Sequence, residues 1–145
     1  MARTAGTLND VTATVDPDRA EVLDSDVISL TIPAAMRFVR LVRIAVASIG
    51  RRRGLSVRAI DDLRLAVDEA FSLLLGDVDH PGAVDVTLEV DEYELLVSIV
   101  QRLDNGPVGC PPDDLVRFEV IISELVDRFD ADPSVGVVQF SKHLS

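Results

Sequence analysis

The sequence contains few of the residues that build disulfides, metal centres or base-stacking surfaces. Among its 145 residues there is one cysteine, Cys110, and there are two histidines, His80 and His143. A single cysteine cannot form an internal disulfide, and the two histidines are far apart and lack ligand spacing, so we expect no metal site. Aromatic residues make up 4% of the chain, which leaves no platform on which nucleic-acid bases could stack.

Long apolar runs are missing as well. No stretch approaches the length of a membrane span, and the first 26 residues contain no apolar core of a signal peptide. We therefore expect a cytoplasmic protein that does not contact membranes. With 48% hydrophobic and 27% charged residues, the composition is typical of one globular domain with a sizeable core.

Positive charge is concentrated in one segment of an acidic chain. The formal net charge is −11, from 14 Lys and Arg residues against 25 Asp and Glu residues. Residues 36–64 carry eight arginines and two aspartates, a charge of +6, whereas residues 65–145 carry four basic and 17 acidic residues, a charge of −13. The acidic remainder would repel phosphates, so we predict no nucleic-acid binding. The basic segment needs another explanation.

Hydropathy patterns predict the element order β-α-α-β-β-α-β. We expect residues 1–27 to form a disordered acidic tail and residues 28–145 to form the domain. Period-two and period-3.6 patterns predict strands at 27–32, 84–90, 95–100 and 135–141, and helices at 34–50, 56–75 and 113–129. Strands and helices mix without strict alternation, which favours an α+β fold in which helices cover one face of a mixed sheet.

Two helical segments carry a family resemblance: Arg43-Ile-Ala-Val-Ala-Ser-Ile49, followed by Leu63-Arg-Leu-Ala-Val-Asp-Glu-Ala70. Together with the predicted hairpin at 84–100 and the ending Phe140-Ser-Lys-His-Leu144, they resemble the anti-sigma factor serine kinases of the RsbW/SpoIIAB type. That family belongs to the GHKL, or histidine-kinase-like, ATPase superfamily. The resemblance covers about four-fifths of the chain and implies a Bergerat-type sandwich of one sheet and its helices.

The resemblance also implies a nucleotide site, whose motif residues are incompletely kept on the second helix. Glu69 stands where such kinases have the general base for the target serine, although a lone glutamate on a helix is more often a solvated charge. Leu73 stands where they have an asparagine that helps to hold Mg²⁺, and a leucine side chain has no lone pair to offer this cation.

The remaining nucleotide motifs are displaced or missing. The adenine-binding aspartate of the family falls on Gln101 by strand register, or on Asp104, followed by Asn105-Gly106, by sequence likeness; both assignments stay open. The family's lid glycines should fall near Val116 and Phe118, but no glycine occurs between Gly109 and Gly136. Without glycines the backbone of a lid cannot approach phosphates closely.

The basic helix is where the resemblance implies a partner-binding face. Arg37, Arg40 and Arg43 recur at steps of three and share one side of the predicted helix. In the family an arginine of this helix contacts both the sigma factor and the anti-anti-sigma factor, and its spacing to Glu69 assigns that role to Arg43. Arginine suits protein interfaces because its planar fork pairs and stacks well. The competing interpretation is a solvated flank of the helix.

Three hypotheses about function follow. The leading one is an anti-sigma factor that sequesters an alternative sigma factor, is released by an anti-anti-sigma factor of the STAS type, forms a homodimer, and has little or no kinase activity or ATP binding. We therefore expect no cofactor. The second is an active, divergent serine kinase that binds Mg·ATP, with Glu69 as base and with Asp104 and Gly106 at the nucleotide. The third is an adaptor of the superfamily without a sigma partner.

Overall fold

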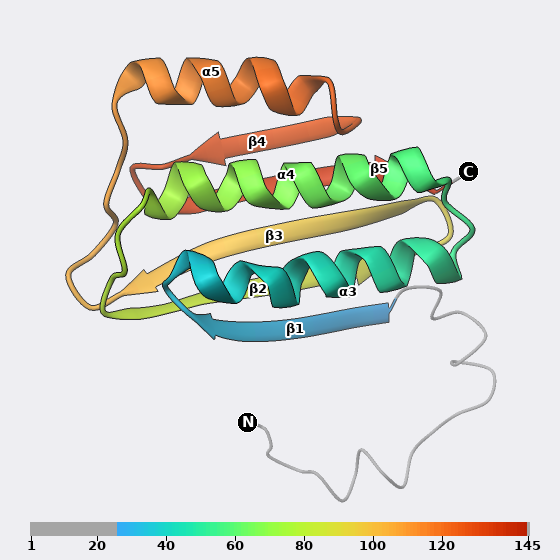
Figure 1. Cartoon of the computed structure of the whole chain (residues 1–145), viewed down its shortest axis with the longest axis horizontal. Coiled ribbons are helices and arrows are strands. Elements are labelled where there is room, and N and C mark those ends of the chain that lie inside the picture. The colour runs from blue at the N-terminus through green and yellow to red at the C-terminus, as the bar shows by residue number, and fades with distance from the viewer. Residues whose placement is uncertain (1–25, 145) are drawn as a thin grey trace, which may run out of the picture.

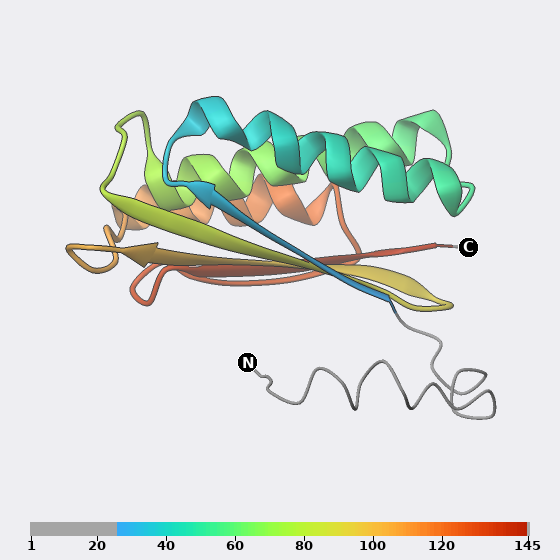
Figure 2. The same cartoon turned by 90° about the horizontal axis from the view of Figure 1, so that it is seen from below.

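The computed structural model describes residues 26–144, which form one sheet with helices on one of its faces (Figure 1). The elements in order are β1 (Asp26–Pro33), the 3₁₀ turn η1 (Met36–Phe38), α3 (Val39–Arg52), α4 (Val57–Leu75), β2 (Gly82–Val90), β3 (Glu94–Leu103), α5 (Pro112–Ser123), β4 (Arg128–Asp132) and β5 (Val137–His143). Figure 2 shows the three α-helices on the same side of the twisted sheet. The predicted α+β architecture is therefore confirmed.

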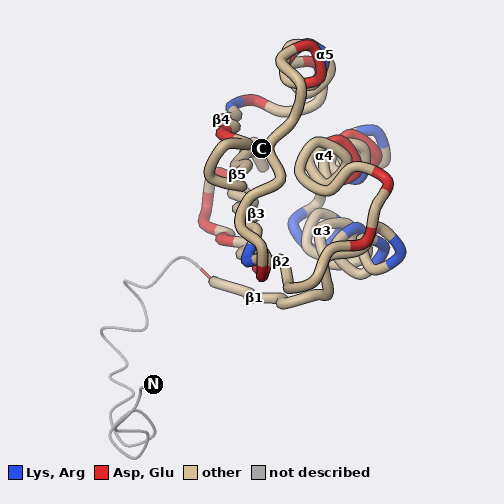
Figure 3. Tube along the Cα trace, turned by 90° about the vertical axis from the view of Figure 1, so that its left-hand side faces the viewer, with Lys and Arg blue, Asp and Glu red and all other residues tan. Residues whose placement is uncertain are grey.

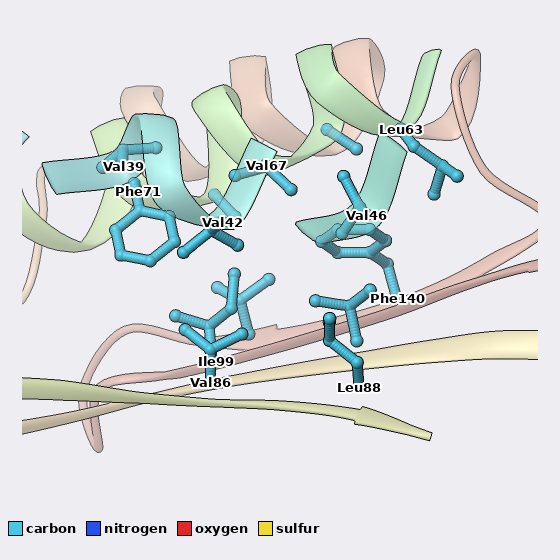
Figure 4. Close-up of a cluster of buried hydrophobic side chains, with 14 of the residues drawn as sticks. Val39, Val42, Val46, Leu63, Val67, Phe71, Val86, Leu88, Ile99 and Phe140 are labelled. Atoms are coloured by element: carbon cyan, nitrogen blue, oxygen red, sulfur yellow. The ribbon is translucent and has the colours of Figure 1, made fainter. Parts of the chain in front are cut away.

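The core lies between the sheet and the helix layer, and the periodicity of the sequence explains which side chains fill it. In β2 every second residue faces the helices, so Val84, Val86 and Leu88 are fully buried, while the residues between them face the open side. The apolar stripe of α3 and the predicted inward positions of α4 are likewise buried. Figure 4 shows side chains from both layers meeting: Val39, Val42, Val46, Leu63, Val67, Phe71, Val86, Leu88, Ile99 and Phe140.

Helices α3 and α4 form a tight antiparallel hairpin. The hydroxyl of Ser56 accepts a hydrogen bond from the N–H of Ala59 at 3.1 Å, which confirms Ser56 as the predicted N-cap. Gly50 lies where the two helices meet: a Cβ at this position would come within 3.1 Å of Cγ1 of Ile60. A larger residue would force the helices apart, so this glycine sets their close packing.

The prediction was wrong in the region after α5. The predicted helix reaching Phe129 ends at Ser123, and residues 128–132 form the edge strand β4 instead. Phe129 nevertheless packs on the helix, with its ring edge-to-face against Phe118 at 6.4 Å between centroids. The short sequence Arg-Phe-Asp-Ala-Asp alternates polar and apolar residues. Three of its five residues are charged, as is common at a sheet edge, so the pattern is too weak to predict a strand.

The unrecognised strand also changes the sheet type. The strand order is β1-β2-β3-β5-β4, and each neighbouring pair is antiparallel, so the expectation of a mixed sheet was wrong. If the last strand followed α5 directly, the helix could return the chain so that this strand ran parallel to β3. Instead β4 follows α5, and the turn from β4 into β5 reverses the chain once more, so β5 runs antiparallel to β3. The last strand begins at Val137, two residues later than predicted, because Asp132–Gly136 form the β4–β5 turn.

The predicted boundary between tail and domain needs a small shift. Asp26, which the prediction placed in the tail, belongs to β1 and pairs with Val90, and Val27, which the predicted first strand already included, pairs with Glu89. Residues 1–25 of the predicted tail lie outside the described residues. Within residues 26–144, no helix combines the length and apolarity that a bilayer crossing requires.

Candidate functional site

The predicted partner-binding arginine, Arg43 of α3, is paired with a residue of α4. Its guanidinium donates a hydrogen bond of 2.6 Å to the carboxylate of Asp68 on α4, and both side chains are about one-third exposed, at 35% and 38%. A partly exposed ion pair of this kind stabilises the fold by less than about 1 kcal/mol. The hydrogen bond orients the Arg43 side chain, and part of that side chain stays accessible to solvent.

The two other predicted arginines are more exposed and differ in their partners. Arg37 donates to Asp79 at 2.6 Å, in a pair that is nearly two-thirds exposed on both sides, and its guanidinium also lies 4.9 Å from the centre of the Phe38 ring. Arg40, one turn from each of the others, is exposed and has no ion pair among residues 26–144. Figure 3 shows the basic positions of α3 and α4 on adjacent helices of the same layer.

Exposed apolar side chains accompany these arginines on the helix layer. Leu41 and Ile44 of α3 are 52% and 53% exposed, and Leu65 of α4 is 50% exposed. Apolar residues next to arginines are the composition that protein interfaces favour. We call Arg40, Arg43, Ile44 and Leu65 the helix-layer face; Leu41, two residues from Arg43, points to the other flank of α3.

Sequence reasoning missed Asp68 as the partner of Arg43. The pairing follows from the register of the helix hairpin. Gly50 of α3 packs against Ile60 of α4. Because the helices are antiparallel, Arg43, seven residues before Gly50, lies level with Val67 and Asp68, seven and eight residues after Ile60. A carboxylate at that level can reach the guanidinium. Finding it needs the register of the helix hairpin, which the hydropathy pattern alone does not define.

Glu69, the predicted general base, lines a small cavity between α4 and α5. The cavity has a volume of about 90 Å³, and its walls are Glu69, Ser72, Leu73, Asp114, Arg117 and Phe118. Ligand pockets typically have volumes of roughly 300–1,000 Å³, so this cavity alone does not hold a nucleotide. It shares Ser72, Leu73 and Asp114 with a neighbouring cavity at the end of α4. Leu73, one turn after Glu69, is 92% buried against the core and offers no oxygen to Mg²⁺.

Helix α5 occupies the place where the resemblance puts a glycine-rich lid. It begins immediately after Pro111, with Pro112 in its first turn and Asp113 and Asp114 at the positive end of its dipole, as the acids predicted. Phe118, at a position where the family has a lid glycine, is 2% exposed and packs into the core, whereas Val116 is 59% exposed. The segment is a packed helix, with no glycine that could bring its backbone onto phosphates.

A second cavity, of about 280 Å³, lies between the end of α4 and the loop before α5. Its walls include Leu73, Val78, Val108 and Pro111, and its charged residues are Asp77 and Asp114. No lysine or arginine lines it. An apolar, acidic lining disfavours a triphosphate, which needs cationic or N–H donors. The residues present around Glu69 therefore do not fit Mg·ATP.

The two candidates for the adenine-binding position lie in different surroundings. Gln101 faces the helices from β3 and is 9% exposed; its amide nitrogen donates to the carbonyl of Leu74 on α4, and its amide oxygen has no hydrogen-bond partner among the described residues. Asp104 is exposed beyond the end of β3. Gly106 lines a cavity of about 200 Å³ with His80 and Asn105. This cavity shares His80 and Val108 with the one at the end of α4, and Glu69 does not line it.

The other potentially reactive groups are dispersed. Among residues 26–144, no three His, Cys, Asp or Glu side chains gather into a group that could hold a metal ion. Cys110 is partly buried in the loop before α5, and its pKa is raised by burial and by the nearby Asp114 carboxylate. A raised pKa keeps the thiol protonated near neutral pH and lowers its reactivity.

Comparison with known proteins identifies the family. A relative from Halalkalibacterium halodurans, named "Serine-protein kinase RsbW", is 30% identical over 129 residues, which are 78% of this chain and 80% of the relative. The chain belongs to the RsbW serine-protein kinase family. The proteins of the same name from Listeria monocytogenes and Bacillus cereus are 35% identical over 86 residues and 27% identical over 79 residues. No family model matches the chain.

The extent of the match differs between these RsbW relatives. The alignment with the Listeria protein covers 56% of this chain and 52% of that protein, so the chain spans about half the length of this curated relative. The alignment with the Halalkalibacterium protein extends over four-fifths of its length. Family membership therefore rests on most of the domain, and the resemblance found from the sequence is confirmed.

Proposed function

We propose that this RsbW-family protein is an anti-sigma factor that works by binding. It sequesters an alternative sigma factor and releases it when an anti-anti-sigma factor of the STAS type takes its place, in the cytoplasm. We propose that the fold is of the Bergerat type, with which one antiparallel sheet under a layer of helices is compatible. The observation that carries the proposal is the contrast between the partly exposed Arg43–Asp68 pair that links α3 and α4 and the small cavity between α4 and α5.

The helix-layer face supports the binding role. Arg43 is oriented by Asp68 with about a third of its side chain exposed, and Arg40 is unpaired within residues 26–144. Two half-exposed apolar side chains, Ile44 and Leu65, add area that water would leave on binding. An acidic partner surface with apolar contacts fits this face, and the docked carboxylates would share or replace Asp68 on Arg43.

The α4–α5 contact supports loss of the cofactor. The cavity at Glu69 is about 90 Å³, and Leu73 is an aliphatic side chain at the position that the resemblance assigns to Mg²⁺ binding. The adjoining cavity presents Asp77, Asp114 and His80 without a lysine or arginine. We propose that the protein binds neither ATP nor Mg²⁺ at this place and transfers no phosphoryl group. Glu69 is then a surface charge at the mouth of a small cavity.

The name of the relatives supports a second candidate, an active serine kinase. In that case Glu69 would be the general base, and Asp104 and Gly106 would contribute to an atypical nucleotide site. The Glu69→Ala variant separates the two candidates, because a kinase would lose phosphotransfer to the anti-anti-sigma factor and keep partner binding. Our proposal expects no phosphotransfer from the wild type and unchanged binding by the variant.

We also propose a homodimer. Its support is the sheet face opposite the helices, which no part of residues 26–144 covers (Figure 2). This face carries a cavity of about 350 Å³ lined by Leu96, Gln139 and Ser141 among others, and the Ser141 hydroxyl is buried without a hydrogen-bond partner in the described part of the chain. Sedimentation equilibrium tests the dimer: a single-chain mass at all concentrations would exclude it.

The test of the anti-sigma function is capture of the partner from the native cell, followed by reconstitution. We expect the full chain to retain one alternative sigma factor, to block its association with RNA polymerase core without added nucleotide, and to release it to the anti-anti-sigma factor. An adaptor without a sigma partner would retain no sigma factor. A complex that forms only with Mg·ATP would contradict the nucleotide-free mechanism.

A further inference from the structure

A groove lies at the end of the molecule where the described chain begins. It has a volume of about 400 Å³ and is lined by Asp26 and Ile28 of β1, Ile49, Arg52 and Arg53 at the end of α3, and Val90 at the end of β2. We call these six residues the terminal groove. Figure 1 shows the start of β1 below the C-terminal end of α3. The groove is distant in the fold from the cavity at Glu69, which lies between α4 and α5.

The floor of the terminal groove is apolar and incompletely covered. Ile28 lies on the helix-facing side of β1, opposite Leu88 in register, yet it is 39% exposed, whereas Ile49 and Val90 beside it are 9% and 3% exposed. An aliphatic side chain on the core side of a sheet is normally covered by the layer above. Here the start of β1 diverges from the end of α3 (Figure 2), so additional apolar atoms could cover Ile28.

The rim of the terminal groove is basic. Neither Arg52 nor Arg53 forms an ion pair with any residue from 26 to 144, although both are exposed. The acids nearby are Asp26, which lines the groove, and Asp91, whose pKa is lowered by backbone N–H groups of Tyr93 and Glu94 and further by the charge of Arg53. Asp91 is already engaged in its turn, so the rim retains positive charge for an acidic occupant.

The segment that precedes Asp26 has the matching chemistry. Residues 16–25 read Asp-Pro-Asp-Arg-Ala-Glu-Val-Leu-Asp-Ser, four acids and one arginine around the apolar pair Val22-Leu23. Leu23 is three residues from Asp26, and an extended chain reaches about 10 Å over that distance. Because the groove is next to the attachment point, the loop to be closed is short and its closure costs little entropy.

We propose that residues 16–25 of this chain dock in the terminal groove. Val22 and Leu23 cover Ile28 and its apolar neighbours, and Glu21 and Asp24 pair with Arg52 and Arg53. The inference does not depend on the anti-sigma function. Its consequence is that the charges of Arg52 and Arg53 are neutralised within the chain, which leaves Arg40, Arg43 and Arg51 as the accessible cations of α3.

The test is nuclear magnetic resonance on the full-length chain. We expect nuclear Overhauser contacts from the methyl groups of Val22 and Leu23 to those of Ile28 and Ile49. The double reversal Glu21→Lys/Asp24→Lys should abolish these contacts and shift the amide resonances of Arg52 and Arg53. Adding Arg52→Glu/Arg53→Glu to the same chain should restore the contacts, because the opposite charges again face each other. Asp10→Lys, a reversal farther up the chain, is the matched control and should leave the contacts unchanged.

Three results would overturn the proposal. The first is a wild-type chain without these contacts, in which Val22 and Leu23 have the relaxation of a free segment. The second is a set of contacts that survives the reversal of Glu21 and Asp24, which would show that Arg52 and Arg53 are not the acids' partners. The third is a set of contacts that fades on dilution, which would assign the groove to a second copy of the chain.

Discussion

Helix α4 has two neighbours in the helix layer, and the two contacts are built differently. Toward α3, the carboxylate of Asp68 pairs with the partly exposed Arg43. The apolar side chains of Ile44 on α3 and Leu65 on α4 are about half exposed. Toward α5, helix α4 presents Leu73 beside a space of about 90 Å³, next to the buried ring of Phe118. One side of the helix keeps polar groups available to another molecule, whereas the other side is closed by the protein's own side chains.

On the proposed function, the two contacts would serve the two halves of a family site differently. The α3–α4 hairpin carries the arginines that we propose for partner contact, and its packing needs no ligand. The α4–α5 contact would have to open to admit a nucleotide, because Phe118 of α5 packs into the core there. The proposal therefore predicts a protein that keeps a binding surface and does not bind the nucleotide.

The largest expected effect comes from emptying the α4–α5 contact. Phe118→Ala removes a ring that is 2% exposed and that packs edge-to-face on Phe129, so we expect it to lower the free energy of unfolding by about 3–5 kcal/mol. Val116→Ala, on the exposed side of the same helix, is the control and should change it by less than about 0.5 kcal/mol. Urea denaturation measures the free energy of unfolding of both variants. If both variants lose the same small amount of stability, α5 does not close the space beside α4.

A smaller effect is expected from the α3–α4 side. Arg43→Glu places a like charge beside Asp68 and reverses the charge offered to the sigma factor, so its affinity should fall at least tenfold, about 1.4 kcal/mol. The unfolding free energy should change by less than about 1 kcal/mol, because the ion pair is partly exposed.

Arg58→Glu is the matched control for Arg43→Glu. It makes the same change of charge within the basic segment, at an exposed position near the start of α4. Isothermal titration with the captured sigma factor should show near wild-type affinity for this variant. Equal losses of affinity in the two variants would indicate that binding depends on net charge and not on the position of Arg43 beside Asp68.

The smallest expected effect concerns Cys110, in the loop that enters α5. Burial and the Asp114 carboxylate both disfavour the thiolate and raise the pKa of this thiol. Alkylation by iodoacetamide should therefore rise with pH at a midpoint above that of free cysteine, and Asp114→Asn should lower that midpoint slightly. Mass spectrometry of the alkylated chain over a pH series measures this. A midpoint below that of free cysteine would indicate a reactive thiol and a more open loop.

The local part of the structure could be predicted from the sequence. The stripe of Val39, Val42 and Val46, the cap at Ser56 and the alternation in β2 all depend on neighbours within a few residues, so periodicity finds them. The strand β4 was missed because five residues with three charges at a sheet edge leave too weak a pattern. The sheet direction was then wrong, because it depends on counting every chain reversal.

The candidate site could be predicted in part. The sequence alone predicts that Leu73, and a segment without glycine near Val116 and Phe118, stand where the resemblance implies a nucleotide site, since chemical identity can be read without coordinates. It does not show that Arg43 is held by Asp68, that Gln101 is tied to the carbonyl of Leu74, or that Gly106 lines a cavity that Glu69 does not line. Each of these depends on which residues the tertiary fold brings together.

The most direct test of the account is isothermal titration of the purified full-length chain with Mg·ATP, together with a phosphotransfer assay that includes the anti-anti-sigma factor. The account predicts no measurable binding heat at millimolar nucleotide and no phosphorylated serine, while the sigma factor still binds. Micromolar binding of Mg·ATP, or clear phosphorylation of a serine in the anti-anti-sigma factor, would contradict it.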